Sequence, residues 1–195
     1  MRITKELLKE KGACAAGYKA FLTEYPEDKY PDGVEYQELL DCCAEKNFDY
    51  GSWLLGTFGK TDDVLKIDGD LIAEKSIIFA GSIEVSGCIE AGFGIEAGFG
   101  IEAGCGIKAG YGIEAGEGIN AGEGINAGCG IKAGCGIKAG CGIKAGYGIE
   151  AGASFGIYAG LHCKITNKSS RKIVAKERPQ NIMCGEFEEL HNDAE

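Results

Sequence analysis

The sequence predicts a mainly β protein, a three-sided parallel β-helix of six-residue repeats with a small α-helical cap at its N-terminus. Isoleucine recurs at every sixth position from Ile89 to Ile149, in units of the form Ile-x-Ala-Gly-x-Gly. A short fixed period is typical of a solenoid, because one repeat cannot bury its apolar face without its neighbours. The 33 glycines of the 195-residue chain fall largely in the Gly-x-Gly positions. Glycine there suits tight corners between strands.

Within each unit, the alternation of side chains along a strand places isoleucine and alanine on one face. The residue between them is Glu, Lys or Asn in every unit from Glu90 to Glu150. The Ile/Ala face is therefore expected inside, and the middle residue outside. The residue between the two glycines varies from Phe to Glu, which indicates an exposed corner, since burying an unpaired glutamate is costly.

The outward charges indicate three units per coil. With three units, stacked neighbours include the opposite pairs Glu90/Lys108 and Glu114/Lys132, with one like pair, Glu96/Glu114. Two units per coil would stack mostly like charges, which destabilise adjacent strands. The repeat resembles the hexapeptide-repeat β-helices, which include acyltransferases and, more loosely, the filament-forming bactofilins. The large residues at the corner position depart from the common pattern and leave the handedness of the coil open.

The six-residue period extends back to Leu65, so we expect a helical cap over 1–63, the solenoid over 64–161 and a C-terminal strand with an acidic tail over 162–195. After Ile149 the period slips by two, which predicts a small loop at 153–155. Residues 163–175 alternate like a strand, and residues 186–195 are expected to be poorly ordered.

Three helices are expected in the cap. Thr4 can cap the first and Gly12 can end it. The second should place Tyr18, Phe21 and Leu22 against the first. The third is expected over 34–48, with the apolar residues at helical spacing being Leu39, Leu40 and Cys43.

The start of this region resembles a short helical module of phage-associated and toxin-immunity proteins of the contact-dependent growth inhibition type. The matching residues are Leu7, Leu8, Lys9, Ala13, Cys14, Gly17 and Phe21. The resemblance carries no catalytic residue with it. The simplest structural role for the module is to cover the open end of the solenoid, whose strand edges would otherwise invite aggregation.

The net charge of −10 disfavours direct nucleic-acid binding and favours a basic protein partner, although it could also serve only to keep the solenoid in solution. No signal peptide or membrane span is apparent, so a cytoplasmic location without membrane contact is expected. The ten cysteines are then expected as free thiols. Cys129, Cys135 and Cys141 should lie on three different corners, which excludes a shared zinc ion. We expect no metal and no cofactor.

Enzymes of the resembled hexapeptide family use a histidine base and a loop that closes over the site. This chain has His162 and His191, both outside the repeat, and no long insertion, so no enzymatic activity is expected. His162 is the one plausible base if the chain is an acyltransferase.

The remaining candidate site is the acidic and aromatic surface of the solenoid. Its residues are Glu90, Glu96, Glu102, Glu114, Glu117, Glu123, Phe93, Phe99, Tyr111 and Tyr147. Rigid aromatic anchors beside carboxylates suit the binding of a basic protein. The leading hypothesis is a non-enzymatic immunity protein, a monomer or dimer, that blocks the active site of a basic toxin, most simply a nuclease. The alternatives are a self-assembling bactofilin-like structural protein and, third, a hexapeptide-repeat acyltransferase.

Overall fold

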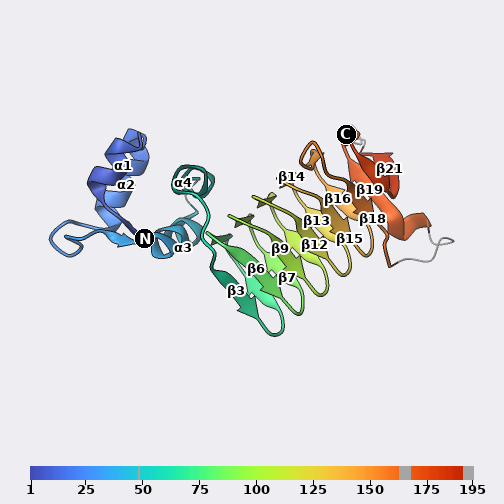
Figure 1. Cartoon of the computed structure of the whole chain (residues 1–195), viewed down its shortest axis with the longest axis horizontal. Helices are drawn as coiled ribbons and strands as arrows, with labels where there is room; N and C mark the ends of the chain where they lie inside the picture. Colours follow the sequence, from blue (N-terminus) through green and yellow to red (C-terminus); the bar gives the residue numbers. More distant parts are fainter. Residues whose placement is uncertain (48, 163–167, 191–195) are drawn as a thin grey trace, which may run out of the picture.

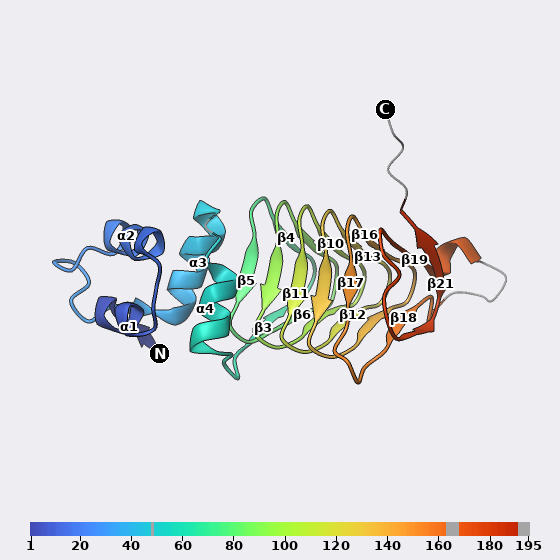
Figure 2. The same cartoon turned by 90° about the horizontal axis from the view of Figure 1, so that it is seen from above.

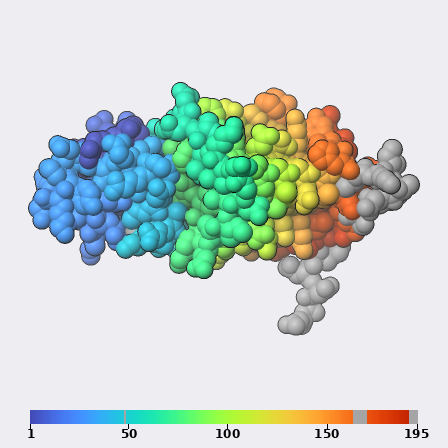
Figure 3. Space-filling model, turned by 90° about the horizontal axis from the view of Figure 1, so that it is seen from below, coloured from blue at the N-terminus to red at the C-terminus, as the bar shows by residue number. Residues whose placement is uncertain are grey.

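The computed structural model describes residues 1–47, 49–162 and 168–190. The molecule is an elongated stack of parallel coils with helices packed at one end (Figures 1 and 2). The N-terminus lies at the helical end, and the last strands lie at the other end (Figure 1). The space-filling view shows the same lengthwise order from the helices to the last coils (Figure 3).

Three parallel sheets form the sides of the stack, and each is named here by its first strand. The β3 sheet contains β3 (Val64–Ile67), β6 (Ser82–Val85), β9 (Ile101–Ala103), β12 (Ile119–Ala121), β15 (Ile137–Ala139), β18 (Ile157–Ala159) and β20 (Ile182–Cys184). The β4 sheet contains β4 (Leu71–Ala73), β7 (Ile89–Ala91), β10 (Ile107–Ala109), β13 (Ile125–Ala127), β16 (Ile143–Ala145), β19 (Lys172–Ala175) and β21 (Glu186–Glu189). The β5 sheet contains β5 (Ile77–Phe79), β8 (Ile95–Ala97), β11 (Ile113–Ala115), β14 (Ile131–Ala133) and β17 (Ile149–Glu150).

The register confirms the three-sided coil. Glu90 lies opposite Lys108, and Glu114 lies between Glu96 and Lys132 on neighbouring strands. These are the neighbours that three six-residue units per coil require. The opposite-charge pairs also form contacts, with the Lys108 Nζ 3.8 Å from a Glu90 carboxylate oxygen.

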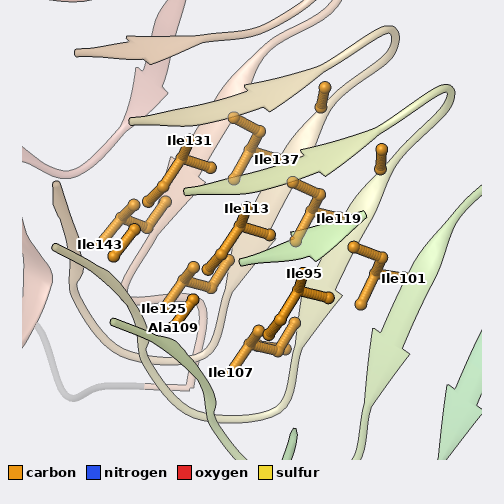
Figure 4. Packing of buried hydrophobic residues seen from close by; sticks show 14 of the residues in the cluster. Ile95, Ile101, Ile107, Ala109, Ile113, Ile119, Ile125, Ile131, Ile137 and Ile143 are labelled. Atoms are coloured by element: carbon orange, nitrogen blue, oxygen red, sulfur yellow. The ribbon is translucent and has the colours of Figure 1, made fainter. Parts of the chain in front are cut away.

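The core is a column of isoleucine and alanine side chains inside the coils. From Ile89 to Ile143, every isoleucine of the repeat is almost fully buried. Equivalent isoleucines stack on one another from coil to coil, as Figure 4 shows for Ile95, Ile113 and Ile131. This burial removes apolar surface from water at about 25 cal/mol per Å², which makes the stack the main stabilising element.

The described residues of the helical cap form two short strands and four helices. In chain order they are β1 (Arg2–Ile3), α1 (Lys5–Glu10), α2 (Ala15–Glu24), β2 (Val34–Glu35), α3 (Tyr36–Lys46) and α4 (Gly51–Phe58). The predicted cap of α1 is confirmed, since the backbone N–H of Leu7 donates to the Thr4 hydroxyl at 3.2 Å. Leu39, Leu40 and Cys43 of α3 are buried as expected.

Two details of the predicted cap are wrong. The helix expected from Val34 begins at Tyr36, because Val34 and Glu35 pair antiparallel with Arg2 and Ile3. Leu22 was expected to pack inward, but it is exposed while Phe21 beside it is buried. Phe48, the expected end of the third helix, lies outside the described residues.

The cap closes one strand edge of the stack with a side chain. Gln37 of α3 donates through Nε2 to the Ile78 carbonyl at 2.8 Å and accepts from the Ala80 N–H at 3.0 Å. The side-chain amide of Gln37 thereby makes hydrogen bonds that a neighbouring strand would otherwise make with the edge of β5. The covering of this edge is made by α3, whereas α1 and α2, which contain the module over residues 7–21, lie farther from the coils (Figure 2).

At the far end, the stack continues beyond residue 161. The predicted loop at 153–155 is present, and Ile157 still pairs with Ile137. A short 3₁₀ helix, η1 (Lys168–Arg171), leads into β19, so the strand expected over 163–175 is seen from Lys172; residues 163–167 lie outside the described part. The expectation of disorder from residue 186 is wrong for Glu186–Glu189, which pair with β19 as β21. Residues 191–195 are also outside the described part.

Candidate binding groove on the β5 sheet

The outward side chains of the β5 sheet form the floor of a groove along the stack. In order from the cap they are Ile78, Glu96, Glu114, Lys132 and Glu150, each in register with the next. They are aligned because one outward residue per strand repeats at each coil. With strands about 4.8 Å apart, the floor from β5 to β17 is about 19 Å long.

Residues from outside the repeat border both ends of the groove. At one end, Asn47, Asp49 and Ser52 of the helical cap border the groove. At the other end, the 177–181 segment between β19 and β20 crosses it. This second segment is held in place in part by Asn181, whose Nδ2 donates to the Ala153 carbonyl at 3.2 Å. The groove is open to solvent along its length and has a volume of about 1250 Å³.

One long side of the groove is an aromatic corner. The corner between the β4 and β5 sheets carries Phe93, Tyr111, Cys129 and Tyr147, one per coil. The rings of Phe93 and Tyr111 are stacked with centroids 5.6 Å apart and planes 15° from parallel. Both residues line the groove. At the far end of the corner, the Lys176 ammonium lies 4.3 Å from the Tyr147 ring centroid, a cation–π contact.

Carboxylates outnumber cations in the lining of the groove. The five acidic residues are Asp49, Glu96, Glu114, Glu150 and Glu177, and the two basic residues are Lys132 and Arg178. The Lys132 Nζ lies 3.7 Å from a Glu114 carboxylate oxygen. The groove is therefore acidic on balance, and its charge density is highest toward the cap.

Glu96 is the carboxylate most strongly affected by its surroundings. Its Oε2 accepts a hydrogen bond from the Ser52 hydroxyl at 2.8 Å, where the start of α4 lies over β8. Burial raises the pKa of Glu96, and the negative charges of Glu114 and Asp49 raise it further, while the Ser52 hydrogen bond opposes them. No cation pairs with Glu96 among the described residues. A positive group placed in the groove would relieve this repulsion.

The structure brings together part of the predicted surface. Glu96, Glu114, Phe93 and Tyr111 line the groove, and Tyr147 continues its aromatic side. The others lie elsewhere on the stack. Glu90 is on the β4 sheet and Glu102 on the β3 sheet, because consecutive units occupy consecutive sides of the coil.

The remaining predicted residues occupy the other two corners. Phe99 and Glu117 lie at the corner between the β5 and β3 sheets, where both contact Lys60. The Lys60 Nζ is 2.7 Å from a Glu117 carboxylate oxygen and 3.6 Å from the Phe99 ring centroid. Glu123 lies at the corner between the β3 and β4 sheets, beside Cys105 and Cys141 along the stack. These three residues do not reach the groove.

The sequence did not identify the groove ends. Asp49, Ser52 and the 177–181 segment lie outside the repeat, and their position depends on how the cap and the last coils pack. The regular repeat drew attention to other residues. The one available signal was the loop character of residues 47–50 and 176–181 on either side of the repeat.

The chain matches no protein-family model, no curated protein and no solved structure. Over the described residues, no cluster of three or more potential metal-ligating side chains occurs. None of the helices in that part of the chain has the length and hydrophobicity that a membrane crossing requires.

The histidine considered as a catalytic base has a backbone partner. The Nδ1 of His162 lies 2.9 Å from the Gly122 carbonyl oxygen, which can only accept, so Nδ1 carries the proton in this arrangement. His162 lies at the corner between the β3 and β4 sheets and is exposed. His191 and Cys163 lie outside the described residues.

Proposed function

We propose that this protein is a non-enzymatic immunity protein that binds a basic bacterial toxin, most simply a nuclease, in the groove on the β5 sheet. The observation that carries the proposal is the groove itself, where five carboxylates and two stacked aromatic rings line one space bordered at both ends. The resemblance of residues 7–21 to a toxin-immunity module supports the choice of partner. In this role the protein acts in the cytoplasm as a monomer or dimer.

The electrostatics of the groove suit a partner with exposed lysine and arginine. A nuclease presents such residues to the phosphates of its substrate, and carboxylates at similar spacing can take the place of those phosphates. Glu96 and Glu114 provide adjacent negative charges on neighbouring strands. Occupation of a nuclease active site by these carboxylates would exclude its substrate.

The aromatic side supplies the apolar part of the interface. Tyr111 and Tyr147 are 57% and 59% exposed, although both are large apolar side chains. Exposed aromatic residues on a rigid backbone lose little conformational entropy on binding and are common anchors at interfaces. The coil holds them in place, so little ordering is needed when a partner binds.

The test is protection of cells from nuclease toxins with a charge-reversed groove. The chain is co-expressed with each of a panel of basic bacterial RNase and DNase toxin domains, and cell survival and copurification are measured. Glu114→Lys should abolish protection against the toxin that the native chain neutralises, with a loss of affinity of about 10- to 1000-fold, typical of truncating or reversing an interface charge. Binding by the native chain should weaken as salt concentration rises.

Glu102→Lys is the matched control. Glu102 holds the same outward position in its repeat unit but lies on the β3 sheet. The Glu102→Lys variant should still protect cells from the toxin. Equal loss with both variants would show that net charge, rather than the groove, governs binding, and no protection against any basic nuclease would contradict the proposed function.

One observation favours the self-assembling alternative. At the cap end, β3 and β4 have a strand neighbour on one side only, and Val64 and Ile72 on these strands are exposed. Such edges can pair with another chain. Light scattering on a sizing column under reducing conditions separates the two proposals, since a discrete monomer or dimer excludes open-ended assembly.

A further inference from the structure

Cys88 occupies a position that is glycine in every later unit of the repeat. It is the last residue of Ser86-Gly87-Cys88, equivalent to the second glycine of Gly-x-Gly, which is retained from Gly94 to Gly148. A Cβ placed on Gly100 or on Gly106 would lie 3.3 Å from a backbone oxygen of the following coil. By the repeat, the side chain of Cys88 is therefore directed toward the following coil.

Cys105 lies in that following coil at the same corner. The Cys105 N–H donates to the Gly87 carbonyl at 3.0 Å, and the Ile89 N–H donates to the Gly106 carbonyl at 3.0 Å. These two hydrogen bonds hold the backbone on both sides of the cysteine pair. Strands about 4.8 Å apart and a one-residue offset place the two Cα atoms about 5–6 Å apart. This separation is within the range of about 4.4–6.8 Å that disulfides span.

The two thiols also interact with each other. The Cys88 thiol is close enough to be the largest cause that raises the pKa of Cys105. Both side chains are partly exposed, so a small solute can reach them. The pair therefore combines contact, backbone spacing and access.

We propose that Cys88 and Cys105 form a redox modification site, which a low-molecular-weight disulfide such as glutathione disulfide converts into a disulfide between adjacent coils. The thiolate of one cysteine attacks glutathione disulfide, forms a mixed disulfide and releases a glutathione thiolate. The thiolate of the other cysteine then attacks the protein sulfur of the mixed disulfide and releases the second glutathione thiolate. Two protein thiols are oxidised, one glutathione disulfide is reduced, and the two protons lost by the protein thiols pass to the released glutathione thiolates through water.

Cys129 and Cys135 of the repeat have different neighbours. Cys129 is hydrogen-bonded through its backbone to Tyr111 and Tyr147 of the neighbouring coils, and Cys135 to Glu117. In the preceding coil, Cys129 is thus stacked on an aromatic residue and Cys135 on an acidic residue, so neither is stacked there on a cysteine.

The surroundings of the pair predict how its reactivity depends on pH. Besides Cys88, the carboxylates of Glu123 and Asp70 raise the pKa of Cys105. Asp70 comes from the turn before β4 and also accepts from the Cys88 N–H at 2.7 Å. The thiolate is the attacking species, so exchange should be slow near neutral pH and should accelerate by up to about tenfold for each pH unit below the thiol pKa.

The experiment maps disulfides in the full-length protein. The reduced protein is incubated in a mixture of glutathione and glutathione disulfide at pH 7 and pH 8, and the remaining thiols are alkylated. The protein is then unfolded and cleaved after glutamate, which separates residues 85–90 from residues 103–114. The expected product is these two peptides joined by a disulfide, lighter by two hydrogen atoms than the two free-thiol peptides together, and formed faster at pH 8.

Two variants make the result decisive. Cys88→Ser should leave Cys105 as a mixed disulfide with glutathione and abolish the joined peptides, whereas Cys129→Ser should leave them unchanged. Separate mixed disulfides at Cys88 and Cys105 in the native chain, or a disulfide that joins either of them to a different cysteine, would overturn the proposal.

Discussion

Glu96 occupies the same position in its repeat unit as Glu90 and Glu102, yet its environment differs. The repeat gives all three an outward direction, but only Glu96 lies under the start of α4, next to Ser52. Burial by the cap raises the pKa of Glu96. The special character of this residue comes from tertiary packing rather than from its unit.

Replacing Glu96 by Gln should stabilise the protein at neutral pH. A carboxyl group whose pKa is higher in the folded state binds more protons when folded than when unfolded. The contribution of Glu96 therefore favours the folded state most at pH values below the pKa of the unfolded state, about 4.5. This contribution is lost as the pH rises through the higher pKa of Glu96 in the folded state. Gln removes the charge but can still accept the Ser52 hydrogen bond. We expect a higher free energy of unfolding at pH 7 and a difference close to zero at pH 4, measured by denaturant titration at both values.

Glu102→Gln is the control, because Glu102 is exposed on the β3 sheet. The critical observation is whether Glu96→Gln raises or lowers the free energy of unfolding at pH 7. If Glu96→Gln lowers stability at pH 7, then an unseen favourable interaction of the carboxylate outweighs its burial.

The two glycines on either side of Phe93 should differ strongly in their tolerance of alanine. A Cβ on Gly92 would collide with the Glu74 carbonyl of the preceding coil, whereas a Cβ on Gly94 would lie 3.5 Å from the Gly112 carbonyl. Overpacking against backbone costs about 1–3 kcal/mol, while a glycine-to-alanine change without a clash alters stability by less than about 1 kcal/mol. Chemical denaturation of Gly92→Ala and Gly94→Ala measures the difference. Equal effects would mean that the coils can shift apart at this corner.

The sequence predicts residue orientation well and residue proximity poorly. The alternation within Ile-x-Ala determines which side chains face outward, and the period of six determines which of them stack. The grouping of Glu96 with Asp49 and Ser52 could not be predicted, because the contact joins the repeat to a helix whose docking position has no periodic signal. The stacking of Phe93 on Tyr111 follows from the three-sided coil, and it marks the side of the groove.

At the scale of elements, the side chain of one α3 residue forms hydrogen bonds with the backbone at the edge of β5. Gln37 satisfies both a backbone N–H and a backbone C=O on the edge of β5. An asparagine or glutamine amide is suited to this task because it contains one donor and one acceptor group in the arrangement of a peptide bond.

Gln37→Ala should weaken the junction between cap and coil. Leaving these two partly buried backbone groups without protein partners costs about 1–3 kcal/mol. We expect faster hydrogen exchange at Ala80 and a lower denaturation midpoint. Gln37→Glu retains an acceptor for the Ala80 N–H but loses the donor to the Ile78 carbonyl. Its rate of hydrogen exchange at Ala80 should therefore lie between the rates of the native chain and of Gln37→Ala. Unchanged exchange in Gln37→Ala would show that other contacts of α3 hold β5.

Besides helix α4, sequence analysis missed strands made of distant partners. The pairing of Arg2–Ile3 with Val34–Glu35 joins two pairs of residues that have no pattern of their own. Similarly, Glu186–Glu189 is largely acidic and gains a strand conformation from the edge of β19. The repeat strands were predictable because each has an identical neighbour one coil away, so local pattern and tertiary pairing agree.

At the scale of the whole molecule, the helices cover part of one end of the stack, at the edge of β5. Ile78 and Ala80 of the first coil belong to the core of the helical cap and not to the solenoid core. Removal of the cap would therefore expose apolar side chains and the β5 edge together.

Deleting residues 1–58 should convert a discrete protein into larger assemblies. With the cap removed, β3, β4 and β5 all lack a partner on the same side, and identical stacks can pair through them. Light scattering should show a molar mass that grows with concentration for the deletion variant and not for the full chain. A deletion variant that stays monomeric would mean that the cap has no role in preventing association.

The near-identity of the coils has a consequence for how this molecule can change over generations. One coil pairs residue for residue with the next, as Ile107 does with Ile89 and with Ile125. A gene that gains or loses one whole coil by unequal recombination would still encode a stack with intact corners and core. Each such event would lengthen or shorten the distance between the two ends of the groove by about 4.8 Å. The length of this surface can thus evolve in steps, independently of the cap and the last strands that border it, to follow a partner of changing size.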